Sequence, residues 1–154
     1  MIVVFDIFQG EIEIGQLESP SVQATVQVFI DKYEPIFLHE QIGDELAAEL
    51  AAGLSEDPVP EKWTLLADML KYPAAEYVYC KYMRDRGVET AGIGTVETEA
   101  ETAKRVSAWS PKIVRAWNEM VDCMQYLHCK LTNSVDYPDY CRKVRYRKIN
   151  SFGI

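Results

Sequence analysis

The chain has 154 residues, a formal net charge of −8 and an apolar content of 48%, which are values typical of a single folded domain and exclude a disordered chain. No apolar run approaches the roughly 20 residues needed to span a bilayer, and the first residues lack the basic segment of a signal peptide. We therefore expect one domain over residues 1–154, made in the cytosol, with no membrane partner.

The charge is strongly polarised along the chain. Residues 1–61 carry thirteen acidic side chains and one basic one, Lys32. Residues 141–154 carry five basic side chains and no acidic one. A chain polarised in this way can present complementary ends to neighbouring copies or to different partners. A solvated acidic face with a basic tail of no functional consequence explains the pattern equally well, and both explanations stay open at this point.

Residues 1–19 are predicted to be an extended arm. Ile12 and Ile14 alternate with Glu11 and Glu13, and this period of two is typical of a half-buried strand.

Residues 20–86 are predicted to be helical. Ser19 offers a capping hydroxyl to a helix that begins at Pro20. Pro35 is expected to kink or restart this helix, because proline lacks the backbone donor. Gly43 then marks its end.

The remaining helices follow from apolar spacing and from proline and glycine. We predict a helix after Asp44, a loop over 55–61, a short helix over 60–70 and another over 72–86. Residues 87–109 are predicted to be a long loop or a hairpin that pairs Glu89–Ile93 with Thr95–Thr98, and residues 134–154 a basic, aromatic tail. Residues 110–133 are predicted to be a long helix that starts at the Ser110-Pro111 signal. The residues expected on its core face are Ile113, Val114, Trp117, Val121, Met124 and Leu127. The predicted fold is mainly α, a bundle of four to five helices with three extended arms.

Metal and catalytic sites are weakly indicated. The candidates for a metal are Cys123, His128, Cys129 and Cys141, but no pair of cysteines has the spacing of a zinc knuckle. A cysteine–histidine pair formed only in the folded chain remains an alternative for nucleophilic catalysis. We expect no enzyme activity, no cofactor and no metal.

Several segments together carry a resemblance to a known group. They are Tyr33-Glu34-Pro35 with Phe37-Leu38, Ile42-Gly43-Asp44-Glu45-Leu46, Tyr77-Val78-Tyr79 with Lys81-Tyr82, Thr90–Gly94, and Ala116-Trp117-Asn118-Glu119-Met120-Val121. Over residues 20–125 the chain resembles the head–tail connector (adaptor or neck) proteins of tailed phages and prophages of Bacteroides-type hosts. The first nineteen residues and the basic tail lie outside the match.

The resemblance implies a structural protein of the virion. Identical copies would form a dodecameric ring beneath the portal, contact the portal and the adjacent neck or tail proteins, and let DNA pass without sequence-specific binding. The alternatives are a small phage-encoded protein that binds and regulates a host protein, and an uncharacterised small enzyme.

Two sets of residues are candidates for these contacts. An acidic set is expected to face the channel or its rim, and a basic, aromatic set to bind a partner; the tail is expected to be dispensable for the helical fold. The acidic set is Glu89, Glu97, Glu99 and Glu101, and the partner-binding set is Arg142, Lys143, Arg145, Tyr146, Arg147, Lys148 and Phe152.

Overall fold

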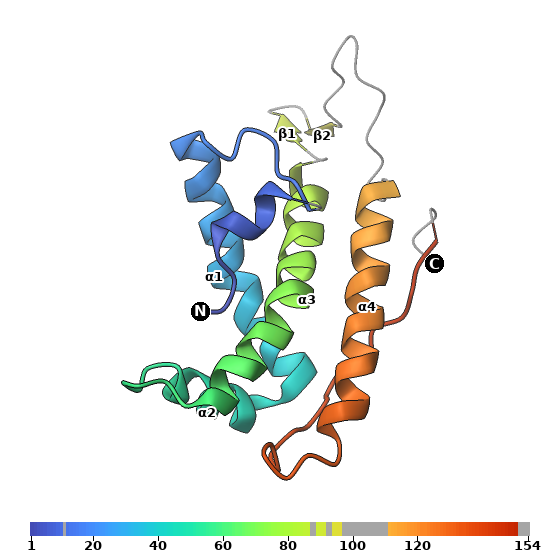
Figure 1. Ribbon diagram of the computed structural model, residues 1–154. Helices are drawn as coiled ribbons and strands as arrows, with labels where there is room; N and C mark the ends of the chain where they lie inside the picture. The colour runs from blue at the N-terminus through green and yellow to red at the C-terminus, as the bar shows by residue number, and fades with distance from the viewer. Residues whose placement is uncertain (11, 87–88, 92–93, 97–110, 151–154) are drawn as a thin grey trace.

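A computed structural model describes residues 1–10, 12–86, 89–91, 94–96 and 111–150. This part of the chain is mainly helical, as predicted, and holds four α-helices, a short 3-10 helix and one hairpin (Figure 1). The elements are η1 (Phe5–Gln9), α1 (Pro20–Ile42), α2 (Asp44–Gly53), α3 (Glu61–Arg86), β1 (Glu89–Ala91), β2 (Gly94–Val96) and α4 (Pro111–Leu131). Within the described ranges, none of the helices combines the length and apolar character that crossing a membrane requires.

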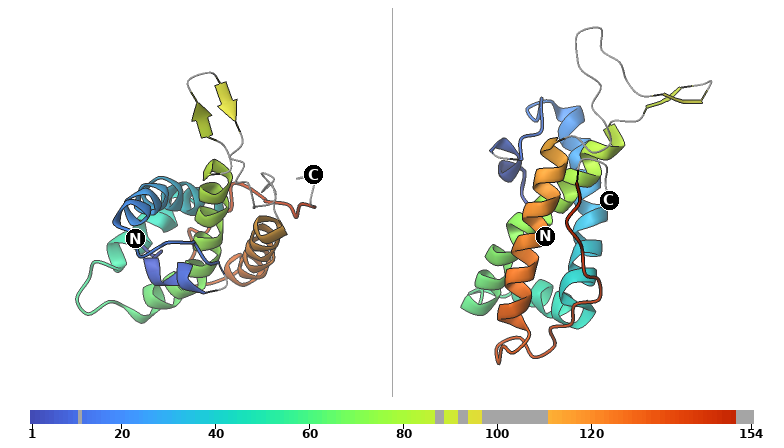
Figure 2. Two further views of the ribbon diagram at one scale, coloured as in Figure 1. Left: turned by 90° about the horizontal axis from the view of Figure 1, so that it is seen from above. Right: turned by 90° about the vertical axis from the view of Figure 1, so that its right-hand side faces the viewer.

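The central element of the bundle is α3, which lies between α1 and α4 (Figure 1). α2 packs at the end of the bundle where α1 finishes. The N-terminal segment covers one face of the bundle and the tail covers the opposite face (Figure 2). Because α3 is covered from all these sides, every residue from Pro73 to Cys80 is buried, as expected of a helix in the middle of a core.

The N-terminal segment is neither a strand nor an arm, and that prediction is wrong. Residues 5–9 form η1, and Val3 and Phe8 are fully buried against the bundle. Ile12 and Ile14 do point inward, as their alternation predicted, but the described residues offer them no partner strand. The segment is held instead by apolar burial and by backbone hydrogen bonds to the side chain of Glu34.

Both internal prolines lie inside continuous helices. α1 runs through Pro35, and α3 runs through Pro73, so the predicted restart and the division into 60–70 and 72–86 are wrong. A proline removes one backbone hydrogen bond from a helix. The residues on both sides of each proline belong to the same buried core, and their burial outweighs that loss.

Replacing Pro35 with alanine is expected to stabilise the protein. Pro35 is exposed, and an alanine there would donate its N–H to the carbonyl of Asp31, raising the free energy of unfolding by about 1–2 kcal/mol. Chemical denaturation measures the change. Pro20→Ala is the matched control, because the first helical residue has no intrahelical acceptor for its N–H and gains nothing. Equal effects of the two substitutions would contradict this account.

A hairpin forms after α3, as predicted, but its strands are Glu89–Ala91 and Gly94–Val96 and so differ in their bounds from the predicted ones. Glu89 pairs with Val96, Thr90 with Thr95 and Ala91 with Gly94. The other residues of the predicted loop over 87–109 lie outside the described residues.

The basic tail is extended, as predicted, but it is not a free arm. Tyr137 is buried, and Tyr140 and Tyr146 pack against the core. The hydroxyl of Tyr137 donates to the carbonyl of Lys62 at 2.7 Å. Deleting the tail would expose part of the core. The tail therefore contributes to the fold, contrary to the expectation that it is dispensable.

Candidate partner-binding site

The extended part of the tail, residues 141–150, crosses the bundle between α1 and α4, and we call it the strap. Its amides reach the end of α1. The N–H of Cys141 donates to the carbonyl of Ile42 at 3.1 Å, and those of Lys143 and Val144 donate to the carbonyl of Glu40 at 2.9 and 3.0 Å. Carbonyls in the last turn of a helix have no intrahelical donor. The strap therefore completes the hydrogen bonding at the end of α1.

Gly43 allows this close approach. Its φ is +87°, and a Cβ at this position would lie 3.0 Å from the carbonyl oxygen of Cys141. A glycine is needed here both for the backbone conformation and for the space it leaves to the strap.

Three side chains of the helices bind the backbone of the strap. The Nε2 of Gln41 donates to the carbonyl of Val144 at 2.9 Å, and the Nε1 of Trp117 donates to the carbonyl of Arg147 at 2.8 Å. Asn118 binds both backbone groups of Ile149, with its Nδ2 donating to the carbonyl at 2.9 Å and its Oδ1 accepting the N–H at 2.8 Å. These contacts fix the path of the strap without using its side chains.

Tyr146 anchors the middle of the strap. Its ring stacks on the ring of Tyr77 of α3, with the two ring centres 5.7 Å apart and an angle of 15° between the ring planes. The centre of the Trp117 ring lies 5.2 Å from that of Tyr146. Its hydroxyl donates to Oε2 of Glu40. Burial, and then the neighbouring Glu40 carboxylate, raise the pKa of the Tyr146 phenol. The sequence placed Tyr146 among the partner contacts, whereas in the structure it holds the strap on the bundle.

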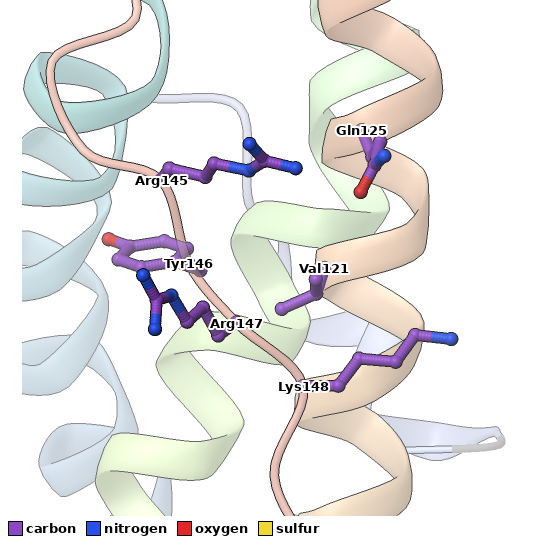
Figure 3. Close-up of a pocket in the computed structure, with 6 residues that line it drawn as sticks. All are labelled: Val121, Gln125, Arg145, Tyr146, Arg147 and Lys148. Carbon is purple, nitrogen blue, oxygen red and sulfur yellow. The ribbon is translucent and has the colours of Figure 1, made fainter.

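The strap and α4 enclose two adjoining hollows of about 410 and 330 Å³, and we call them together the basic groove. From the strap, Arg145 and Lys148 extend toward α4, whereas Tyr146 and Arg147 extend toward the other side (Figure 3). The groove is lined by Val121, Gln125, His128 and Cys129 of α4 and by Arg142, Lys143, Arg145, Tyr146, Arg147 and Lys148 of the strap.

The positive charges of the groove differ in their partners. Lys148 pairs with Asp122 at 2.7 Å, and Lys143 pairs with Asp44. Arg145 and Arg147 are exposed, and neither forms an ion pair with a residue of 12–86 or 111–150. Two arginines are therefore free to bind an acidic group from outside, and arginine suits carboxylates and phosphates because of its planar fork of donors.

Asp44 provides a direct measure of how the strap is docked. The Lys143 ammonium, and then His39, hold the pKa of the Asp44 carboxyl below its ordinary value. We expect Lys143→Ala to raise this pKa toward the ordinary value and His39→Ala to raise it less, as followed by NMR titration of the carboxyl carbon. The stabilisation that Asp44 adds is present above its unfolded pKa and is lost as pH falls through its lower folded pKa. An unchanged Asp44 pKa in Lys143→Ala would show that the strap does not dock here in solution.

The remaining candidate residues are Phe152, Glu89, Glu97, Glu99 and Glu101. Phe152, Glu97, Glu99 and Glu101 lie outside the described residues, and only the backbone of Glu89 is described.

The structure also places the cysteines. All four are free, and only Cys80 is buried. Burial raises the pKa of the Cys80 thiol to about 12, and burial also raises the pKa of Cys123, so neither is activated as a nucleophile. In the described part of the chain, no three histidine, cysteine, aspartate or glutamate side chains are grouped so that they could hold a metal ion.

The helix residues that bind the strap were missed in the sequence. The spacing of the last helix predicts Trp117 as a core residue, and no sequence pattern assigns a role to Asn118 or Gln41. The available signal was Gln41, which lies four residues after Phe37 on the apolar face of a predicted helix, where a buried amide needs a hydrogen-bond partner.

Comparison with protein-family models, with curated proteins and with solved structures found no match to this chain.

Proposed function

We propose that this chain is a structural subunit of the head–tail connector of a tailed phage. Identical copies form a ring beneath the portal in the virion, and the ring docks the phage tail or the next ring. The proposal is supported by the resemblance of residues 20–125 to connector proteins. It is also supported by the basic groove between the strap and α4, which is shallow and charged and therefore suited to another macromolecule.

The observation that carries the proposal is the separation of charge on the folded surface. Arg145 and Arg147 are both exposed on the strap, with Arg145 extending toward α4 and Arg147 toward the other side (Figure 3). Exposed acidic residues lie on α2, in the loop after it and at the start of α3, namely Asp44, Glu45, Glu49, Glu56, Asp57 and Glu61. Complementary patches of this kind steer association and fix the register of stacked subunits.

The groove is proposed to dock on an acidic surface of the portal or of the neighbouring ring. The ring itself is proposed to let DNA pass without binding it, because a chain with 24 acidic and 16 basic residues repels the phosphate backbone on average.

The proposal is tested by a quantitative protein inventory of purified virions from the phage that encodes this chain. A copy number near that of the portal is expected. Absence from the particle would overturn the proposal and favour the alternative, a regulator that binds one host protein.

A charge-reversed variant tests the role of the groove. Arg145→Glu with Arg147→Glu is expected to lower incorporation into virions about tenfold or more, because two attractive contacts become repulsive. Lys112→Glu with Lys130→Glu is the matched control, since these lysines are exposed on α4 but do not line the groove. Equal incorporation of the two variants would remove the groove from the proposal.

A further inference from the structure

The site that holds the strap is a binding site for an extended peptide. Gln41, Trp117 and Asn118 all bind backbone groups of the strap, and the last-turn carbonyls of α1 accept its amides. Groups that bind backbone atoms hold any extended segment of the right length, so the site does not by itself require that the segment belong to the same molecule.

Side chains give this site its preference for one sequence. The ring of Tyr146 fills the space against Tyr77 and Trp117, and Lys143 and Lys148 meet Asp44 and Asp122 at the two ends. The matching segment has lysines on either side of a tyrosine, as residues 143–148 do. A second copy of the chain offers the same segment.

The connection between α4 and the tail can act as a hinge. α4 ends at Leu131, and the next buried residue is Tyr137. Between them, Thr132 and Asn133 are exposed and Val135 is 93% exposed. An extended chain gains about 3.4 Å per residue, so residues 132–135 can span about 14 Å, which reaches a copy packed against this end of α4.

Charge favours the approach of tails to other copies. All 24 acidic residues precede Cys141, whereas residues 141–154 carry five basic residues and no acidic one. Each tail is therefore attracted to the acidic body of a neighbour as well as to its own.

From these observations we propose that in the assembled protein, residues 136–150 of one copy occupy the groove between α1 and α4 of a second copy. The exchange keeps every contact of the tail, including the hydrogen bond of Tyr137 to Lys62, and changes only the hinge. When each copy gives its tail to the next, the contact is head-to-tail, and such a contact forms a ring if the rotation between neighbouring copies closes. The exchange of tails does not depend on the proposed function, and only the ring-shaped assembly rests on it.

The test uses the ion pair between Lys148 and Asp122, which joins the tail to α4. Full-length chain at natural abundance and full-length ¹⁵N-labelled chain are mixed in equal amounts, allowed to assemble, and treated with a zero-length carbodiimide cross-linker. Mass spectrometry then counts cross-links that join a light peptide to a heavy one. Exchange predicts that about half of the Lys148–Asp122 cross-links in the assembled fraction are mixed and that the monomer fraction has none.

Deleting Asn133 and Ser134 from the hinge is expected to raise the assembled fraction about tenfold or more, because a shorter hinge hinders the return of the tail to its own α4, whereas the tail contacts are the same in both forms. Inserting two glycines after Asn133 is the matched control, since a longer hinge eases the return of the tail to its own copy and is expected to lower the assembled fraction.

Three results would overturn the exchange: only same-isotope cross-links in the assembled fraction, a chain that stays monomeric at high concentration, or equal effects of the two variants. These results are independent of the virion inventory. Mixed cross-links from a protein absent from virions would retain the exchange and reject the connector, and the converse result would do the opposite.

Discussion

Gly53→Ala is expected to destabilise the protein by about 3 kcal/mol, although alanine is the better helix former. Gly53 is the last residue of α2, and a Cβ placed on it would overlap Cδ1 and Nε1 of the Trp63 indole. Trp63 is only 6% exposed and lies against Tyr137, with the Lys62 ammonium 4.2 Å from the centre of its ring. The indole therefore cannot move aside without disturbing the start of α3 and the tail.

The measurement is the free energy of unfolding from chemical denaturation, with Gly15→Ala as control, because a Cβ at Gly15 meets no atom within 4 Å. In a Trp63→Ala background the cost of Gly53→Ala should disappear, since the two residues couple through direct contact. A cost that persisted without the indole would show that the overlap is not its cause.

Glu34→Ala is expected to cost about 3 kcal/mol and to release the N-terminal segment. Glu34 lies in the middle of α1, and its side chain is 7% exposed. Its Oε1 accepts the N–H of Ile2 at 3.0 Å, and its Oε2 accepts that of Val3 at 2.9 Å. The substitution leaves two buried amides without an acceptor, and burying an unsatisfied amide is costly.

Two readouts separate this effect from a general loss of stability. Chemical denaturation gives the free energy, and hydrogen exchange of a peptide covering residues 1–19 reports whether the segment has left the bundle. Asp31→Ala is the control, because Asp31 is an exposed acid on the same helix that accepts one hydrogen bond from Gln27 at 2.6 Å. An unchanged exchange pattern in Glu34→Ala would mean that apolar burial alone holds the segment.

The long helix α4 shows what local sequence predicts well. Its start at Pro111 follows from the Ser110-Pro111 signal, and most of the residues assigned to its core face, such as Met124 and Leu127, are buried. The exceptions are Val114 and Trp117, which are only partly buried. The outcome for Trp117 could not be foreseen, because the carbonyl that its Nε1 reaches lies thirty residues away.

The candidate site was also only partly predictable from the sequence. Five basic residues within seven positions of the tail indicated a contact surface, and the structure brings Arg142, Lys143, Arg145, Arg147 and Lys148 to one groove. Pattern alone did not show that Tyr146 turns into the bundle, or that Asn118 binds Ile149. Both contacts depend on α1, α3 and α4 packing around the strap, and periodicity within one segment carries no information about that packing.

The sequence by itself determined that this is a mainly helical chain with an acidic first part and a basic end, because helical spacing, start signals and charge are local properties of the chain. Only the tertiary structure decided that the helices continue through Pro35 and Pro73, that residues 1–19 dock on the buried carboxylate of Glu34, and that the tail lies across the bundle as a strap. Each of these depends on contacts between residues far apart in the chain, such as the pairs Ile2–Glu34 and Asn118–Ile149. The free energy of those contacts outweighs the local preference for a broken helix, a strand or a free arm.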